Sequence, residues 1–148
     1  MSRHNLLIPA LLCLAPALLA QEQQAKALVK EAVAFGRKQG KEALLLETNQ
    51  GQGRFHAKAG GDLYIFIYDL QGNCQAIGFQ SQMVGVNRWN LRDPDGKFFL
   101  QEMIGIVKTK GSGWLDYKYP NPSTGRIEQK TSYVESFDGW LVGCGFYH

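Results

Sequence analysis

Aromatic and cationic side chains recur at alternate positions in three segments of this sequence. Aromatic residues alternate through residues 63–68, tyrosines and a tryptophan lie in residues 114–119, and a lysine lies within residues 126–137. Side chains alternate between the two faces of a β-strand, so this spacing brings members of each set to a common face. Apolar walls with a few convergent donors are what a pocket for a small anion requires.

This reasoning gives a set of candidate ligand-binding residues. They are Tyr64, Phe66, Trp114, Tyr117, Tyr119, Lys130 and Tyr133. Two alternatives stay open: the aromatic residues form an ordinary core, or Lys130 is a solvated charge on an edge strand. A buried Lys130 would need an anion, which a ligand could provide. The alternation leaves open which face of the sheet carries the pocket.

The sequence contains no common catalytic motif. HExxH, CxxC and G-x-S-x-G are all absent, and His56 and His148 are the histidines that follow residue 20. We therefore expect neither enzymatic activity nor a cofactor.

One segment partly matches a calcium-binding loop. Asp93, Asp95, Gly96 and Glu102 have the spacing of such a loop, but Leu91 stands where its first carboxylate ligand belongs. We expect a turn followed by a helix capped by Asp95, and no metal site.

The length and net charge of the chain favour a single globular domain and argue against a nucleic-acid-binding protein. The chain has 148 residues, of which 45% are hydrophobic, so it is predicted to be a single globular domain. Its formal net charge is +3, and no run of five or six basic residues occurs. Such a run is the footprint of a nucleic-acid-binding protein, so we expect no nucleic-acid partner.

The first twenty residues have the form of a secretory signal peptide. Arg3 and His4 precede an apolar stretch, residues 6–19, which Ala20 and a polar run follow. This stretch is shorter than the about 20 residues that a membrane-spanning helix needs. We expect cleavage after Ala20, a periplasmic or secreted product and no membrane span in it; an uncleaved membrane anchor is the alternative.

The remaining chain would keep Cys74 and Cys144, which lie in separate predicted strands. An exported protein could pair them, and the alternative is two buried thiols. The sequence leaves this choice open.

The elements that position the candidate residues follow from hydrophobic spacing. Apolar residues at helical spacing begin at Ala25, and a second short helix follows Gly40. The expected elements are helices at 25–39, 41–47 and 97–108 and strands at 63–68, 74–79, 114–119, 126–137 and 140–147. The first strand is apolar on both faces, whereas the strand at 126–137 is polar on average and is predicted to bury one face. Runs of consecutive strands indicate antiparallel pairing and an α+β domain.

Several short motifs, in this order, resemble a single Cache domain. They lie at residues 61–69, 83–87, 95–97, 110–117, 121–125, 130–134, 138–140 and 142–147. Each motif alone is weak, but the ordered set covers roughly residues 25–147. The resemblance implies a long N-terminal helix packed on a five- to six-stranded antiparallel, PAS-like sheet. Residues 1–20 would then be the signal peptide, and residues 21–148 the single Cache domain.

The resemblance also implies a function. Such domains are the extracytoplasmic sensors of chemoreceptors and histidine kinases, and members often bind acetate, propionate, pyruvate or lactate. The ligand would lie over the sheet, under the segment between the second and third strands. We assign Lys130 to the carboxylate, Tyr117 to a hydrogen bond, and Trp114 and Tyr64 to the walls.

Two departures from the family shape the expected function. Ile77 and Gly78 stand where the family often has His-Pro, so a potential donor is missing. The sequence stops at His148, where a receptor would continue into a membrane helix and a signalling module. We expect a soluble exported domain that binds a small organic acid and acts in signal transduction or chemotaxis through a membrane receptor or kinase partner. The alternative is a ligand-free interaction module that docks on a membrane sensor.

Overall fold

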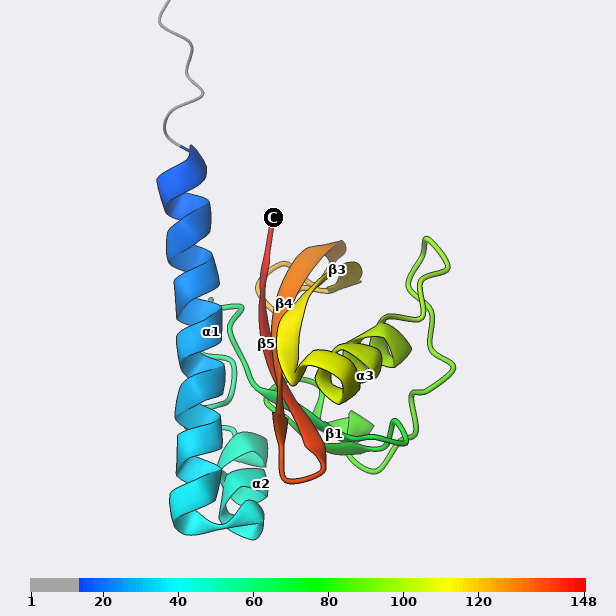
Figure 1. Ribbon diagram of the computed structural model, residues 1–148. Helices are drawn as coiled ribbons and strands as arrows, with labels where there is room; N and C mark the ends of the chain where they lie inside the picture. Colours follow the sequence, from blue (N-terminus) through cyan, green and yellow to red (C-terminus); the bar gives the residue numbers. More distant parts are fainter. Residues whose placement is uncertain (1–13) are drawn as a thin grey trace, which may run out of the picture.

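The computed structural model describes residues 14–148, so most of the predicted signal peptide lies outside the described residues. Figure 1 shows the long helix α1 (Leu14–Gln39) standing against one side of a sheet, while helix α3 (Phe99–Lys110) lies on the other side. Between the helices, the described residues form one sheet of five strands in the order β2-β1-β5-β4-β3. The predicted α+β fold, with a long helix packed on an antiparallel sheet, is confirmed.

Helix α1 begins well before the predicted position. It is continuous from Leu14 through Ala20, because residues 17–24 are mostly good helix formers and Pro16 falls in the first turn, where proline is tolerated. Gly40, at φ 97°, separates it from α2 (Lys41–Asn49), as predicted. Among the helices of residues 14–148, none is long and apolar enough to cross a membrane.

The strands form antiparallel neighbours throughout the sheet. Their bounds are β1 Phe66–Asp69, β2 Cys74–Ile77, β3 Ser112–Pro120, β4 Ile127–Phe137 and β5 Trp140–Tyr147. Asp138 and Gly139 join β4 to β5 with φ values of 47° and 80°, and two positive values are typical of a tight hairpin turn. The strand nearest the C-terminus, β5, lies in the centre and pairs with both β1 and β4.

Both faces of the sheet are buried. On the α3 side a core includes Tyr64, Phe66 and Val134, and on the α1 side a second core includes Ile65 and Tyr133. The prediction that residues 126–137 bury one face is wrong: residues 130–135 of β4 are buried without interruption. Strand β4 lies between β5 and β3 and contacts helices on both sides, so its polar residues are enclosed.

The two described cysteines belong to different cores. Cys74 lies in the core on the α3 side and Cys144 in the core on the α1 side, and both are free. Burial raises the pKa of the Cys74 thiol to about 11 and that of the Cys144 thiol to about 12. Of the two alternatives that the sequence left open, the structure has the pair of buried thiols.

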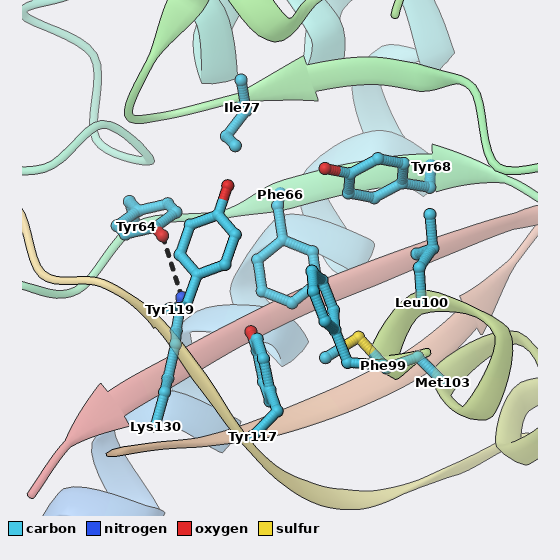
Figure 2. A pocket seen from close by; sticks show the side chains of 10 residues that line it. All are labelled: Tyr64, Phe66, Tyr68, Ile77, Phe99, Leu100, Met103, Tyr117, Tyr119 and Lys130. Atoms are coloured by element: carbon cyan, nitrogen blue, oxygen red, sulfur yellow. Dashed lines mark hydrogen bonds between the residues drawn. The ribbon is translucent and has the colours of Figure 1, made fainter. Parts of the chain in front are cut away.

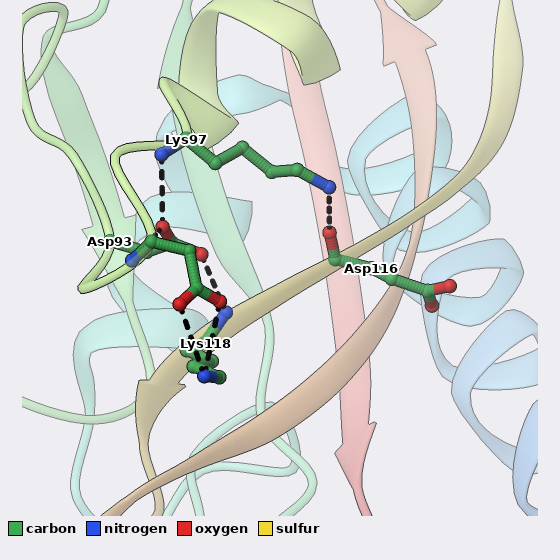
Figure 3. A network of polar contacts seen from close by, with 5 residues as sticks. Asp93, Lys97, Asp116 and Lys118 are labelled. Carbon is green, nitrogen blue, oxygen red and sulfur yellow. Dashed lines mark hydrogen bonds and ion pairs between the residues drawn. The ribbon is translucent and has the colours of Figure 1, made fainter.

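The segment at residues 93–97 covers the outer edge of β3 (Figure 3). One carboxylate oxygen of Asp93 accepts the backbone N–H groups of Asp95 (3.0 Å) and Lys97 (2.9 Å), and the other accepts that of Lys118 in β3 (3.1 Å). The Lys97 ammonium donates to the Asp116 carbonyl at 2.5 Å. Burial opposes the charge on Asp93, but these N–H donors outweigh it and lower the pKa of the carboxyl below its usual value.

Helix α3 therefore lacks the cap that the sequence suggested. It begins at Phe99, its N-cap residue is Phe98, and no side chain caps it, so the prediction that Asp95 caps this helix is wrong. Asp93, rather than Asp95, organises the turn, because its carboxylate bonds to backbone N–H groups of the turn and of β3.

We expect Asp93→Ala to lower the free energy of unfolding by about 1–3 kcal/mol, since it removes a charged acceptor from several backbone N–H groups. Asp95→Ala is the matched control. It removes an exposed ion pair with Lys118 and should cost less than about 1 kcal/mol. Urea denaturation of both variants checks this, and equal losses would contradict the role given to Asp93.

Candidate ligand-binding site

A buried pocket lies between the sheet and helix α3 (Figure 2). It is lined by Tyr64, Phe66, Tyr68, Ile77, Phe99, Leu100, Met103, Tyr117, Tyr119 and Lys130. Side chains from β1, β2, β3, β4, α3 and the segment before β1 thus converge on one space. The pocket is small: the centre of a water molecule can move within a volume of about 10 Å³. The pocket therefore has room for about one water molecule.

Lys130 supplies the positive charge of this pocket. It lies in β4 and is 1% exposed. Its Nζ donates to the Tyr64 hydroxyl at 2.9 Å. Aromatic ring centroids surround Nζ at 4.3 Å (Tyr64), 5.0 Å (Tyr147), 5.1 Å (Tyr119), 5.3 Å (Phe66) and 5.9 Å (Tyr117). No carboxylate of residues 14–148 lies within 4.0 Å of this ammonium, so its stabilisation comes from aromatic faces and a neutral hydroxyl.

Two glycines of β5 make room for these side chains. A Cβ atom on Gly145 would lie 2.7 Å from Cε of Lys130 and equally close to the Thr131 carbonyl oxygen. A Cβ atom on Gly143 would overlap the ring of Phe66. Gly143 and Gly145 therefore let Phe66 and Lys130 lie directly across the central strand.

A chain of hydrogen bonds orients the Lys130 ammonium. Tyr147 donates its hydroxyl proton to the Pro120 carbonyl at 2.6 Å, and the hydroxyls of Tyr64 and Tyr147 are 3.3 Å apart. Because Lys130 donates to Tyr64, the Tyr64 proton goes on to Tyr147. An ammonium has three N–H donors, and within the described part of the chain this bond uses one of them. The other two have no hydrogen-bond partner among the described residues.

Burial sets the protonation of the pocket. It lowers the pKa of the Lys130 ammonium to about 7 and raises the pKa values of Tyr64 and Tyr117 well above their usual range. Near neutral pH, Lys130 is present in both its charged and its neutral form. The tyrosine hydroxyls stay protonated and can act as donors.

A further cation, which the sequence analysis missed, lies behind Tyr119. The Arg88 guanidinium donates to the hydroxyls of Tyr119 (2.6 Å) and Tyr68 (3.0 Å), and its Cζ is 5.4 Å from the Tyr119 ring centroid. Tyr119 in turn donates to Oε1 of Gln80 at 3.1 Å. Gln80 and Arg88 belong to the segment between β2 and α3, which these bonds attach to the rim of the pocket.

The structure brings five of the predicted site residues together in this pocket: Tyr64, Phe66, Tyr117, Tyr119 and Lys130. The other two, Trp114 and Tyr133, do not line it. Tyr133 belongs to the core on the α1 side, and Trp114 is 37% exposed and packs on Tyr133 with ring centroids 5.2 Å apart. Trp114 and Tyr117 have opposite parity in β3, so Trp114 lies on the face of the sheet opposite this pocket.

Several lining residues escaped the sequence analysis. Tyr68 has the same parity as Tyr64 and Phe66, and Phe99 and Met103 lie on the predicted buried side of the third helix, so spacing could have found them. Arg88 has no such signal, because it lies in an irregular segment with no periodicity.

The sequence and the fold match a known class of sensor domain. The chain belongs to the single Cache domain 2 family, whose model matches residues 18–148. This confirms the resemblance drawn from the sequence motifs. The family is a sensing module of chemoreceptors and histidine kinases.

Two sequence relatives are signalling proteins by name. A stretch of 90 residues is 43% identical to the sensor histidine kinase MctS of Rhizobium johnstonii and covers 60% of this chain. A stretch of 59 residues is 36% identical to the methyl-accepting chemotaxis protein McpP of Pseudomonas putida and covers 38% of this chain. The matches span 19% and 11% of those proteins, so the chain corresponds to a small part of each.

Solved structures support the same fold. A methyl-accepting chemotaxis protein from Vibrio parahaemolyticus superposes with a TM-score of 0.75 at 22% identity, covering 89% of this chain and 91% of that one. A Cache chemosensory domain, described for carboxylic acid recognition, superposes with a TM-score of 0.69 at 25% identity. That match covers 89% of this chain and 96% of the other.

The burial of Lys130 makes stability depend on pH. In the unfolded chain a lysine has a pKa of about 10.4, whereas burial lowers that of Lys130 to about 7. The folded state then binds fewer protons between these values, so Lys130 makes the protein less stable as pH falls from about 10 to 7, with no further change below. Relative to Lys130→Met, the wild-type protein should lose about 3 kcal/mol of unfolding free energy between pH 9.5 and 6.5.

Urea denaturation of the wild type and Lys130→Met at pH 6.5, 8.0 and 9.5 measures this difference. The subtraction cancels the titration of groups that both proteins share. A difference that is constant across this range would show that Lys130 keeps an ordinary pKa in the folded protein.

Proposed function

We propose that this Cache domain binds a small organic carboxylate and acts in signal transduction or chemotaxis through a membrane receptor or kinase partner. One observation carries the proposal: the buried ammonium of Lys130 lies in an aromatic pocket with no carboxylate of the described residues within ion-pair distance. A buried charge that lacks a partner favours an anion of complementary size. That the chain is a binding domain rather than an enzyme is part of this proposal.

The pocket has both parts that a short-chain acid needs. Lys130 can donate its two remaining N–H groups to the carboxylate, and the buried Tyr117 hydroxyl, now paired with Ser132 Oγ at 3.0 Å, lies on the same side. Phe66, Phe99 and Met103 present apolar surface to the rest of the ligand. Tyr64 acts as wall and as hydrogen-bond acceptor.

Ligand entry requires the pocket to widen, because its space is about that of one water molecule. The segment between β2 and α3 is the candidate cover, since Gln80 and Arg88 bond to the Tyr119 hydroxyl. Displacement of Tyr119 would break both bonds and release this segment from the rim of the pocket. Ligand binding would thereby be coupled to the position of this segment.

The comparisons support this assignment. A relative at 25% identity is described for carboxylic acid recognition, and MctS and McpP are named as a sensor kinase and a chemoreceptor. We extend to this chain the location outside the cytoplasm and the partnership with a membrane protein. Cleavage after Ala20 would remove the first turns of α1 and leave its buried residues, which begin at Ala25, in place.

A second candidate is a ligand-free interaction module that docks on a membrane sensor. The observation that favours it is the exposure of Val84, Val86 and Leu91, apolar side chains on the segment between β2 and α3. Exposed apolar side chains gathered on one segment are typical of protein contacts.

A thermal-shift panel of acetate, propionate, pyruvate and lactate separates these candidates. An acid that binds the folded state raises the melting temperature, since it adds RT ln(1 + [L]/Kd) to the unfolding free energy. We expect at least one acid to do so, and Lys130→Met to lose the shift. Lys108→Met is the matched control, because it removes the same charge from an exposed position of α3. No shift with any acid would reject carboxylate binding and favour the interaction module.

Two aromatic substitutions test which face binds the ligand. Tyr117→Phe removes a pocket hydroxyl and should weaken binding about tenfold, roughly the value of one hydrogen bond. Trp114→Phe alters the opposite face of the same strand and should leave the affinity unchanged. Calorimetric titration with the acid that gives the largest shift measures both, and the reverse pattern would place the ligand on the α1 side.

A further inference from the structure

Lys130 lacks the counter-charge that normally accompanies a buried cation. Its Nζ contacts aromatic rings and one hydroxyl, and 1% of the residue is exposed. An aromatic cage stabilises a cation less well than water and a carboxylate together do, so this pocket favours loss of the ammonium proton. A carboxylate placed beside Nζ would reverse this preference.

We propose that the pocket takes up a proton from water together with a carboxylate wherever Lys130 is neutral before binding, so that the domain responds to the acid and to pH jointly. This inference rests on the proposed function, because it needs a carboxylate at Lys130. The proton adds to the neutral Lys130 amine and forms an N–H bond, and the carboxylate becomes the counter-ion. No other bond changes, and the complex gains no net charge.

The groups that face Lys130 do not remove this effect. They are Asp62 and Tyr64 before β1, Tyr68 in β1, Tyr117 and Tyr119 in β3, Cys144 and Tyr147 in β5, and Arg88 before α3. Helix α3 contributes apolar side chains to the pocket: Phe99, Leu100 and Met103. Asp62 and Cys144 favour the charged lysine and Arg88 disfavours it, but burial is the largest influence and lowers the pKa to about 7.

The sign and size of the effect follow from this pKa. Below about pH 7, Lys130 is already charged, so binding takes up few protons and the affinity is nearly constant. Above about pH 7, each binding event must also protonate Lys130, so the affinity falls by up to tenfold per pH unit. Between pH 6.0 and 8.5 the Kd should rise about 30-fold.

Isothermal titration calorimetry with sodium propionate and sodium lactate tests this at pH 6.0, 7.0 and 8.5. Each titration is run in two buffers that titrate near the chosen pH and differ in ionisation enthalpy, such as phosphate and imidazole at pH 7.0 or borate and Tris at pH 8.5, so the dependence of the binding enthalpy on buffer counts the protons taken up. We expect about 0.1 proton at pH 6.0, about half at pH 7.0 and nearly one at pH 8.5. A Kd that is constant from pH 6.0 to 8.5 with no proton uptake would overturn the inference, while the proposed function would stand.

A second measurement tests Lys130 directly. In protein with 13C-labelled lysine side chains, the Lys130 Cε resonance, assigned by its absence in Lys130→Met, should titrate near pH 7. Propionate should move that midpoint upward by more than two pH units, because nearly one proton is taken up at pH 8.5. A midpoint near 10 without propionate would reject the inference. Absence of binding by either acid at every pH would reject the proposed function and the inference with it.

Discussion

The burial of the Lys130 ammonium, which costs free energy of hydration, is the constraint on which the arrangement of the surrounding side chains depends. The ammonium lies within the sheet's α3 side, where tyrosine and phenylalanine rings and the Tyr64 hydroxyl replace its hydration. Other features serve this arrangement: Gly145 gives the lysine side chain room, Tyr147 orients Tyr64, and α3 closes the space above. Burial in these surroundings lowers the pKa of the Lys130 ammonium to about 7, far below that of a lysine on the surface.

Much of the fold could be predicted from local pattern, because each element buries a regular set of side chains. The spacing from Ala25, the hairpin at Asp138 and Gly139, and the break at Gly40 correspond to observed elements. The start of α1 could not be placed, since its first turns have few buried side chains and leave no helical period in the sequence. The polar composition of β4 led to the wrong prediction that this strand buries one face. Composition does not show that neighbouring strands and helices enclose a polar strand.

The candidate site could be predicted only as far as alternation along a strand assigns side chains to one face of the sheet or the other. Tyr64 and Phe66, or Tyr117 and Tyr119, necessarily share a face once their strands are correct. Parity within a strand also separates Trp114 from Tyr117 and Tyr133 from Lys130, so the predicted set spans both faces of the sheet. The choice between the faces required the pairing register, which was unknown. The position of Arg88 could not be predicted, because this residue lies in the long irregular segment between β2 and α3. The path of that segment is set by tertiary contacts, such as that of Asp93 with β3, rather than by local sequence preference.

The central position of β5 in the sheet has a consequence for the folding of the domain. Strands β1 and β2 form one hairpin and β3 and β4 another, and β5 joins them by pairing with β1 and β4. Until residues 140–147 leave the ribosome, the earlier strands have no common partner, so the sheet and its pocket cannot assemble. Assembly that depends on such distant pairings is slow. The pocket is therefore complete only after the last strand of the sheet has paired with both hairpins.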